Sequence, residues 1–335
     1  MMQPGLFDRQ NRFEKLDKNG DPLVKLNKVV PWNSFRPALE TLRAGEKKST
    51  AGAKPYDVVV MFKILILQSL YNLSDEATEY QVLDRLSFMR FLGLRLGSKV
   101  PDAKTIWLFR EQLTEAGLAE ELFRQFETVL GKSGFTAKKG QIIDAGIVQA
   151  PKQRNSREET ARIKQGEIPQ EWEKAKKRQK NTDARWSKKN AKSYYGYKNH
   201  INVDVKHKLV RAYSVTDADS NAFDDLLEEN NRSADVYADS AYRSKESIGL
   251  LEKRGFRERL QRKGCKHRKL TEREQQGNKT RAKIRCRIEH VFGVMTMMAG
   301  SLMVKTVGII RARTKIGLGN LTYNINRYGL LAITG

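Results

Sequence analysis

The chain has 335 residues, of which 39% are hydrophobic and 8% aromatic, enough to bury a core and to form two domains. Its 63 Lys and Arg residues exceed its 39 Asp and Glu residues by 24, which favours a polyanionic partner, above all nucleic acid. Two cysteines exclude a disulfide scaffold or zinc finger, and no uninterrupted apolar stretch is long enough to span a bilayer. We therefore expect a cytoplasmic protein without a membrane partner.

Helical patterns dominate the first 135 residues. Residues 1–54 are predicted to form an arm with one short helix over residues 34–44. Residues 55–135 are predicted to form an all-helical domain, with helices over residues 58–73, 76–92, 104–115 and 118–130. Basic residues at the helix ends suit DNA binding, but no helix-turn-helix pattern is evident, so dimerisation or packing is the open alternative.

From residue 136 to 335 the pattern changes to that of an α/β domain. Strands are predicted over residues 141–149, 197–204, 209–216, 235–240 and 256–261, the second and third joined by a hairpin turn at residues 205–208. Helices are predicted over residues 221–229, 244–254 and 280–298. A basic, apolar-poor insertion at residues 151–193 separates the first two strands. We expect it to lie over the surface or to become ordered on DNA.

Positive charge is concentrated in two blocks. Residues 151–200 carry a net charge of +9 and residues 251–290 a net charge of +10, while residues 201–250 between them carry −4. This pattern predicts carboxylates that gather cations within a surface that binds phosphates, although each block could also be an ordinary solvated face. The predicted DNA contacts are Lys176, Lys177, Arg185, Lys188 and Lys189 in the insertion, Lys198 and His200 on the second strand, and Arg281, Lys283 and Arg285 on the last helix.

Three acidic residues stand out as a candidate site. Asp144 interrupts an Ile- and Val-rich strand, and Asp239 ends another, where an ionised carboxylate needs a cation or hydrogen-bond donors. Glu289 borders the apolar stripe of the last helix, with Arg285 one turn before it. Taken singly, the aspartates could be turn caps and Glu289 a surface ion-pair partner. Taken together, they suit Mg²⁺ or Mn²⁺, and two such ions can drive in-line displacement at phosphorus.

Other kinds of site fit the sequence less well. It lacks a glycine-rich nucleotide-binding loop and a nucleophile-elbow serine, which argues against an ATP-driven motor or a serine hydrolase. Its four histidines lack zinc-site spacing with Cys265 or Cys286.

Several segments in a fixed order carry a resemblance to a known family. They are Pro55–Tyr56, residues 101–110, Ile143–Asp144–Ala145, residues 183–186 leading to residues 196–200, residues 237–242, and residues 285–292. Over most of its length the chain resembles bacterial insertion-sequence transposases of the IS-five family, whose DDE catalytic domain has the RNase H-like fold. The resemblance implies that Asp144, Asp239 and Glu289 are the metal-binding triad, holding Mg²⁺ or Mn²⁺ as two ions.

The resemblance also implies a reaction and its partners. The enzyme would cleave DNA at terminal inverted repeats and then join the freed 3′-hydroxyl to target DNA, acting as a homodimer on DNA at the bacterial nucleoid. Arg285 and Glu289 match the family's Tyr-x2-Arg-x3-Glu-x6-Lys signature, but Ala282 and Thr296 replace its Tyr and Lys. Lys283 or Lys305 could substitute for the missing Lys. The alternatives are a catalytically inactive DNA-binding descendant and an RNase H-like nuclease that does not join strands.

Overall fold

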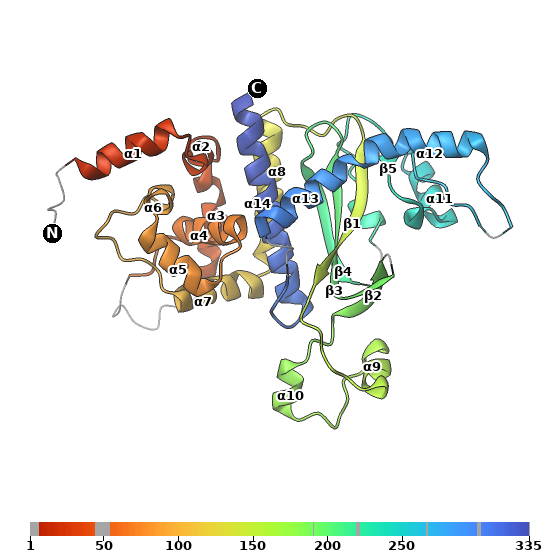
Figure 1. Cartoon of the computed structure of the whole chain (residues 1–335), viewed down its shortest axis with the longest axis horizontal. Coiled ribbons are helices and arrows are strands. Elements are labelled where there is room, and N and C mark those ends of the chain that lie inside the picture. Colours follow the sequence, from red (N-terminus) through yellow and green to blue (C-terminus); the bar gives the residue numbers. More distant parts are fainter. Residues whose placement is uncertain are drawn as a thin grey trace. The chain divides into compact units, whose positions relative to one another are not determined.

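The structure, a computed structural model, describes residues 7–43, 54–189, 191–218, 222–265, 267–299 and 303–334 (Figure 1). The chain forms two units, residues 1–129 with 321–335, and residues 130–320. Residues 321–335, which the sequence assigns to the C-terminal domain, thus group with the N-terminal helices. The long helix α14 (Ile309–Thr334) contributes residues to both units.

The first unit is helical throughout its described residues. Its elements are α1 (Asp8–Lys18), α2 (Pro22–Val29), the short 3-10 helix η1 (Trp32–Phe35), α3 (Arg36–Glu40), the 3-10 helix η2 (Thr41–Arg43), α4 (Val58–Tyr71), α5 (Asp75–Asp84), α6 (Leu86–Leu92), α7 (Ala103–Glu115), most of α8 (Leu118–Lys132) and the end of α14. The predicted helix over residues 34–44 is instead the series η1, α3 and η2, and its last residue lies outside the described part. The predicted helix over residues 76–92 is two helices, because the backbone at Arg85 is extended.

The apolar stretch at residues 57–73 forms the core helix α4 of this unit. Asp57 caps its start, and Phe62 on α4 packs against Phe35 with ring centroids 4.9 Å apart. In the described part of the chain no single helix has the length and apolarity to cross a membrane, while α4 and α5 would satisfy that test only as a pair bent by 102°. Asp102 caps α7, as the sequence predicts, whereas α5 is capped by Ser74, one residue before the cap expected at Asp75.

The second unit combines a sheet with helices. Its elements are β1 (Gln141–Gln149), α9 (Arg157–Lys164), α10 (Lys174–Gln179), β2 (Arg185–Lys189), β3 (Lys192–Asp204), β4 (Val210–Asp217), the 3-10 helix η3 (Asp224–Leu226), β5 (Asp235–Tyr237), the 3-10 helix η4 (Ser240–Tyr242), α11 (Lys245–Lys253), β6 (Arg257–Glu258), α12 (Glu272–Arg285), α13 (Arg287–Ala299) and the start of α14. The mixed α/β fold class predicted from the sequence is confirmed.

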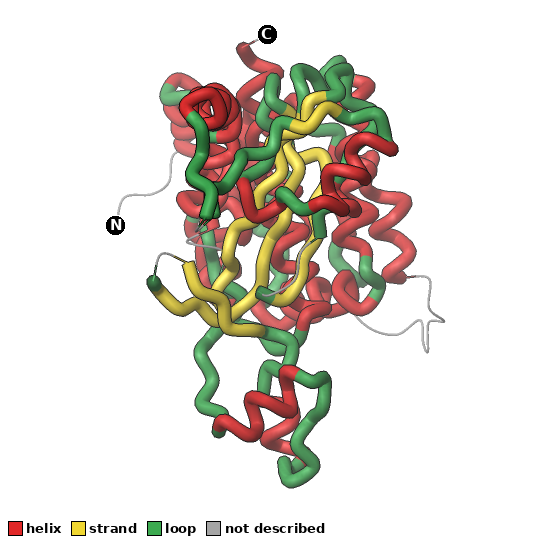
Figure 2. The backbone as a smooth tube through the Cα atoms, turned by 90° about the vertical axis from the view of Figure 1, so that its right-hand side faces the viewer, coloured by secondary structure: helices red, strands yellow, loops and turns green. Residues whose placement is uncertain are grey.

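The strands form one mixed sheet in the order β2-β3-β1-β5-β6, with β4 also paired to β3 (Figure 2). The long strand β3 runs antiparallel to β1, β2 and β4, whereas β1, β5 and β6 are mutually parallel neighbours. The parallel register pairs Ile142 of β1 with Tyr237 of β5. The strands β1 and β5 therefore point their carboxyl ends in the same direction.

Several details of this unit differ from the sequence predictions. The strand predicted over residues 235–240 ends at Tyr237, the one predicted over residues 256–261 is only Arg257–Glu258, and the one predicted over residues 197–204 starts earlier, at Lys192. The predicted helix over residues 221–229 is only the short turn η3, and residue 221 lies outside the described part. The predicted helix over residues 280–298 starts earlier, at Glu272, and is divided at Cys286 into α12 and α13. The strand β2 lies within the segment predicted as a helix-compatible insertion.

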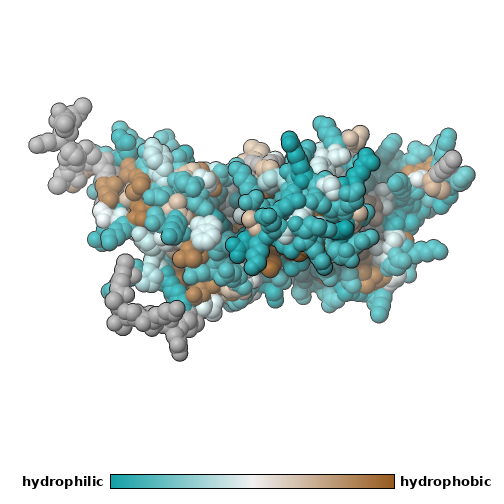
Figure 3. Space-filling model, turned by 90° about the horizontal axis from the view of Figure 1, so that it is seen from below, coloured by the Kyte–Doolittle hydropathy of each residue, from teal (hydrophilic) through white to brown (hydrophobic). Residues whose placement is uncertain are grey.

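The insertion has a small core of its own. Ile163 and Trp172 are buried, and the Trp172 Nε1 donates a hydrogen bond of 2.6 Å to Glu159. Its outer surface is hydrophilic, as the space-filling view from below shows (Figure 3). The insertion therefore consists of the helices α9 and α10 and connecting segments with a buried centre of two side chains.

Candidate active site

Asp144 lies on β1, and Asp239 lies at the matching position just after the end of β5. Each is two residues beyond the paired residues Ile142 and Tyr237. Because neighbouring strands are about 4.8 Å apart, the two carboxylates are neighbours where β5 ends. Burial, and then the negative charges of the nearby Asp144 and Asp239, raise the pKa of Tyr242.

Each aspartate accepts defined hydrogen bonds. Asp144 Oδ1 accepts from the backbone N–H of Ala145 at 2.8 Å, and its Oδ2 accepts from Arg285 Nη1 at 2.8 Å. Asp239 Oδ1 accepts from the backbone N–H of Ala241 at 2.8 Å and so caps η4. Asp239 is thus a turn cap, which is one of the two roles that the sequence left open for it. Among the described contacts, only Oδ1 takes part in this cap.

Glu289 is connected to this pair through Arg285. Arg285 ends α12, and Glu289 lies in the first turn of α13. Arg285 Nη2 is 4.0 Å from Glu289 Oε1, while Nη1 of the same guanidinium contacts Asp144. The Glu289 side chain is 68% exposed, so it can change rotamer at little cost. One cationic group therefore bridges two of the three predicted carboxylates.

Close packing holds α13 against β1. A Cβ atom at Gly146 would lie only 2.7 Å from Phe292 Cε1, so this glycine allows the helix to approach the strand. Ile288 and Val291 on the same helix are fully buried, which confirms the predicted apolar stripe. Since Glu289 is one turn before Phe292, this packing keeps Glu289 beside the strand that carries Asp144.

A buried hydrogen-bonded group lies behind the aspartates. His200 is 2% exposed, its Nε2 is 2.9 Å from Thr216 Oγ1, and its Nδ1 is 3.4 Å from the Tyr242 hydroxyl. Burial, assisted by the charge of Lys198, lowers the pKa of His200 to about 4, so the ring is neutral near pH 7. With almost no exposed surface, His200 is placed to support the site rather than to touch DNA directly. Tyr242, which the sequence reasoning did not assign to the site, was signalled only by its position three residues after Asp239.

The insertion residues predicted to contact DNA have different surroundings. Lys176 forms an ion pair of 2.9 Å with Glu159 and lies 5.0 Å from the Trp172 ring centroid. This ion pair, together with the Trp172 hydrogen bond, lowers the pKa of Glu159 to about 2. Lys177 is exposed and has no ion-pair partner in the described part of the chain.

Among the predicted DNA contacts on β2 and β3, Arg185 is bound to the protein's own backbone, whereas the lysines differ in exposure. The Arg185 guanidinium donates to the backbone carbonyls of Thr182, Ala184 and Ile163, and so joins the insertion to β2. Lys188 is exposed, and Lys189 ends the strand. Lys198 is partly buried on β3.

On α12, the two predicted basic residues before Arg285 also differ. Lys283 is exposed, and Arg281 Nη1 lies 3.4 Å from Asn278 Oδ1. The assignment of these residues to DNA binding stays a prediction.

Asp144, Asp239 and Glu289 are the candidate ligands for a divalent cation. Within the described ranges, no group of three or more His, Cys, Asp and Glu side chains is arranged closely enough to hold a metal ion. The donor chemistry nevertheless suits a hard cation, since Asp144 and Asp239 are adjacent carboxylates and Arg285 already attracts Asp144 and Glu289. Glu289 is exposed and is connected to Asp144 through the guanidinium of Arg285.

Comparison with known protein families agrees with this arrangement. Residues 136–325 match the family described as Transposase DDE domain, and residues 11–112 match the family described as Transposase domain (DUF772). The first match covers more than half of the chain and includes Asp144, Asp239 and Glu289. The mixed sheet is consistent with the RNase H-like fold of such a domain. The chain therefore belongs to the DDE transposases, a family of phosphoryl-transfer enzymes that act in transposition.

Proposed function

We propose that the protein cleaves DNA at the terminal inverted repeats of a bacterial insertion sequence of the IS-five family and joins the freed 3′-hydroxyl to target DNA. The observation that carries the proposal is the matching position of Asp144 on β1 and Asp239 just after β5, with Arg285 between Asp144 and Glu289. Double-stranded DNA is the substrate, which places the protein at the bacterial chromosome, and paired cutting of two ends calls for a homodimer on DNA.

Asp144, Asp239 and Glu289 are the residues that would hold Mg²⁺ or Mn²⁺, as two ions. When bound, these ions supply activation of the attacking oxygen and stabilisation of the leaving oxygen at phosphorus. Arg285 orients the Asp144 carboxylate through its 2.8 Å hydrogen bond. Tyr242 and His200 exclude water behind the carboxylates, because both side chains are buried.

The departures from the family signature lie on α12 and α13. Ala282 lies one turn before Arg285 and is partly buried, and Thr296 is exposed with its hydroxyl bonded to the Phe292 carbonyl at 2.8 Å. Neither position contacts the three carboxylates in the described structure. We infer that Ala282 and Thr296 alter how α12 and α13 bind the transposon end. The exposed Lys283 offers a replacement cation there.

The function is tested with labelled DNA that carries the ends flanking the coding sequence, incubated with the protein and Mn²⁺. We expect nicked ends followed by joined products in a target plasmid. Cleavage without joining would identify a nuclease, and binding without cleavage would identify an inactive descendant. Either of these two outcomes contradicts the proposed transposase activity.

Replacement of Arg285 tests its positioning role. Arg285→Ala removes the hydrogen bond to Asp144 and should lower the cleavage rate by about 10²-fold while changing non-specific DNA affinity by less than about threefold. The dependence of the cleavage rate on Mn²⁺ concentration should move to higher concentration, because Asp144 is no longer oriented. Equal losses of cleavage and of non-specific binding would instead make Arg285 a general phosphate contact.

Charge reversal in the insertion tests its contact with phosphates. Lys177→Glu should weaken DNA binding and reduce the slope of log affinity against log salt concentration by about 1, with thermal stability unchanged. Lys176→Glu should also lower the melting temperature, since it places a second carboxylate against Glu159. Fluorescence anisotropy over a salt series and thermal unfolding make both measurements. An unchanged salt slope in Lys177→Glu would show that the insertion does not bind phosphates.

A further inference from the structure

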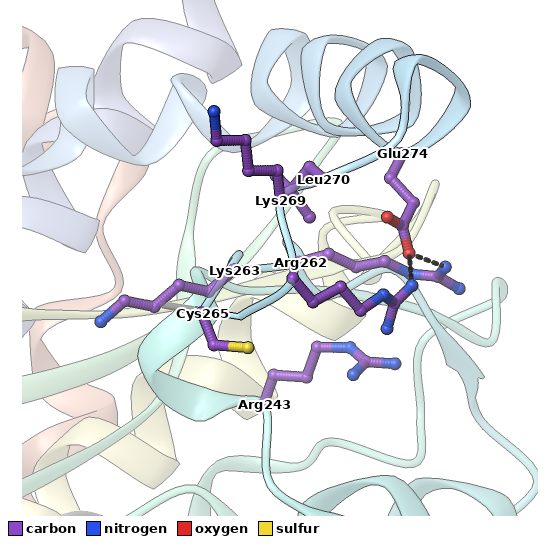
Figure 4. Close-up of a pocket in the computed structure, with 8 residues that line it drawn as sticks. Arg243, Arg262, Lys263, Cys265, Lys269, Leu270 and Glu274 are labelled. Atoms are coloured by element: carbon purple, nitrogen blue, oxygen red, sulfur yellow. Dashed lines mark hydrogen bonds and ion pairs between the residues drawn. The ribbon is translucent and has the colours of Figure 1, made fainter.

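A second group of basic residues lines a cavity outside the catalytic carboxylates. The cavity has a volume of about 210 Å³ and lies between the end of η4, the segment 262–270 and α12 (Figure 4). Its charged lining consists of Arg243, Arg262, Lys263, Arg268, Lys269 and Glu274. Five cations thus face a cavity with one carboxylate, an imbalance that favours an anionic ligand.

Glu274 organises this cavity. Its Oε2 accepts a hydrogen bond of 3.0 Å from the backbone N–H of Thr271 and completes a capping box at the start of α12. Its Oε1 accepts from Arg262 at 3.0 Å and from Arg268 at 2.7 Å. The hydrogen bonds to Thr271 and the two arginines lower the pKa of Glu274, so it remains ionised and holds both guanidinium groups. Arg243 is held separately, by Glu258 at 3.1 Å.

The arrangement is that of a preformed anion site. Figure 4 shows the guanidinium groups of Arg243 and Arg262 on the same side as the Glu274 carboxylate, with Lys263 and Lys269 extending to the other side. Guanidinium groups bind phosphate oxygens in pairs, and groups held in advance lose less entropy when they do so. At about 30 Å³ per water molecule, the cavity has the volume of about seven waters, which accommodates a phosphate group.

The position of Arg243 connects the cavity to the candidate active site. Arg243 is four residues after Asp239, so their Cα atoms are at most about 14 Å apart. A nucleic-acid strand advances about 3.4 Å per nucleotide, so this distance spans about four nucleotides. A strand that passes over Asp239 can therefore reach the cavity within a few nucleotides.

We propose that this cavity binds a backbone phosphate of the DNA a few nucleotides from the scissile phosphodiester. The proposal rests on the proposed DNA substrate, but it adds a binding site that the three carboxylates do not include. Arg268 and Lys269 are suitable test residues, because both are exposed and Arg262 would still hold Glu274 after their replacement.

The first test measures DNA affinity in EDTA over a salt series. Arg268→Gln with Lys269→Gln should weaken binding about tenfold and reduce the salt slope by up to about 2. The matched control is Arg232→Gln with Lys253→Gln, two exposed residues that precede β5 and β6 and so lie near the opposite ends of these strands from Asp239. The control should change affinity by less than about twofold.

The outcomes separate this proposal from the function on which it rests. If the wild-type protein does not bind DNA, the proposed function fails and the phosphate site fails with it. If the wild type binds DNA but the test and control variants have the same affinity and salt slope, only the phosphate site is wrong.

The second test uses the thiol in the cavity. Cys265 lines the cavity and is exposed, and Cys286 is exposed at the C-cap of α12. Alkylation followed by mass spectrometry should show that DNA slows modification of Cys265 at least about fivefold, and that inorganic phosphate at the same phosphate concentration does so less. Protection by inorganic phosphate but not by DNA would assign the cavity to a free anion and overturn the proposal. Absence of protection by DNA in a protein that binds DNA would also overturn it.

Discussion

Asp144→Asn and Asp239→Asn should each reduce DNA cleavage by at least about 10³-fold, which corresponds to about 4 kcal/mol of transition-state stabilisation. Asparagine preserves the shape of each side chain, and its Oδ1 can still accept from the backbone N–H that each aspartate now binds. DNA affinity should stay equal or increase, because each change removes negative charge from a basic surface. Gel assays of cleavage and binding on the same labelled ends give both quantities.

A matched control for these variants is Asp225→Asn, which changes an exposed aspartate within η3 in the same unit. It should cleave at the wild-type rate. If either triad variant cleaves within about tenfold of this control, the corresponding aspartate is not part of the active site.

Gly196→Ala is the second substitution with a large expected effect. It should destabilise the protein by about 3 kcal/mol or more. Gly196 has φ +155°, a backbone conformation that favours glycine, and lies in β3 between Arg185 of β2 and Gln149 of β1. A Cβ atom there would lie 2.9 Å from the backbone N of Ala150 and still closer to the carbonyl oxygen of Val148. These are backbone atoms of the central strand and its exit, so they cannot move without disturbing the sheet.

Urea unfolding of Gly196→Ala measures this loss directly. Gly249→Ala is the control, since no atom lies within 4 Å of a Cβ at Gly249 in the middle of α11, and it should stabilise the protein by about 0.5–1 kcal/mol. A free energy of unfolding for Gly196→Ala within about 0.5 kcal/mol of the wild type would contradict the described packing of β3 on β1.

Sequence patterns predicted the elements whose signals are local. The strand β1 has the predicted bounds, residues 141–149, because a β-branched run follows Gly140 and ends before a proline. The helix α7 begins at the predicted cap Asp102, since a capping side chain bonds within its own turn.

Elements defined by long-range burial were not predictable in the same way. In α14, residues 316–325 are all buried, so this helix shows no apolar stripe and its sequence gives no helical period. The predicted helix over residues 221–229 is only the turn η3, around which Phe223, Leu226 and Leu227 are buried in the core of the second unit. Local propensity therefore gave way to tertiary packing.

The site was partly predictable for a similar reason. An aspartate within an apolar strand is unusual enough to notice, and the parallel register of β1 and β5 then places Asp144 beside Asp239. By contrast, sequence cannot show that Arg185 donates to backbone carbonyls or that Lys176 pairs with Glu159. The basic cavity joins Arg243 to residues up to 31 positions later, a proximity that only the folded chain reveals.

Binding of Mn²⁺, followed by electron paramagnetic resonance in the presence of DNA, tests most directly whether the three acidic side chains act together. Asp144→Asn, Asp239→Asn and Glu289→Gln should each weaken Mn²⁺ binding at least about tenfold, because each removes one charged ligand from a shared site. Asp225→Asn should bind Mn²⁺ as the wild type does. Wild-type Mn²⁺ affinity in all three triad variants would contradict the account.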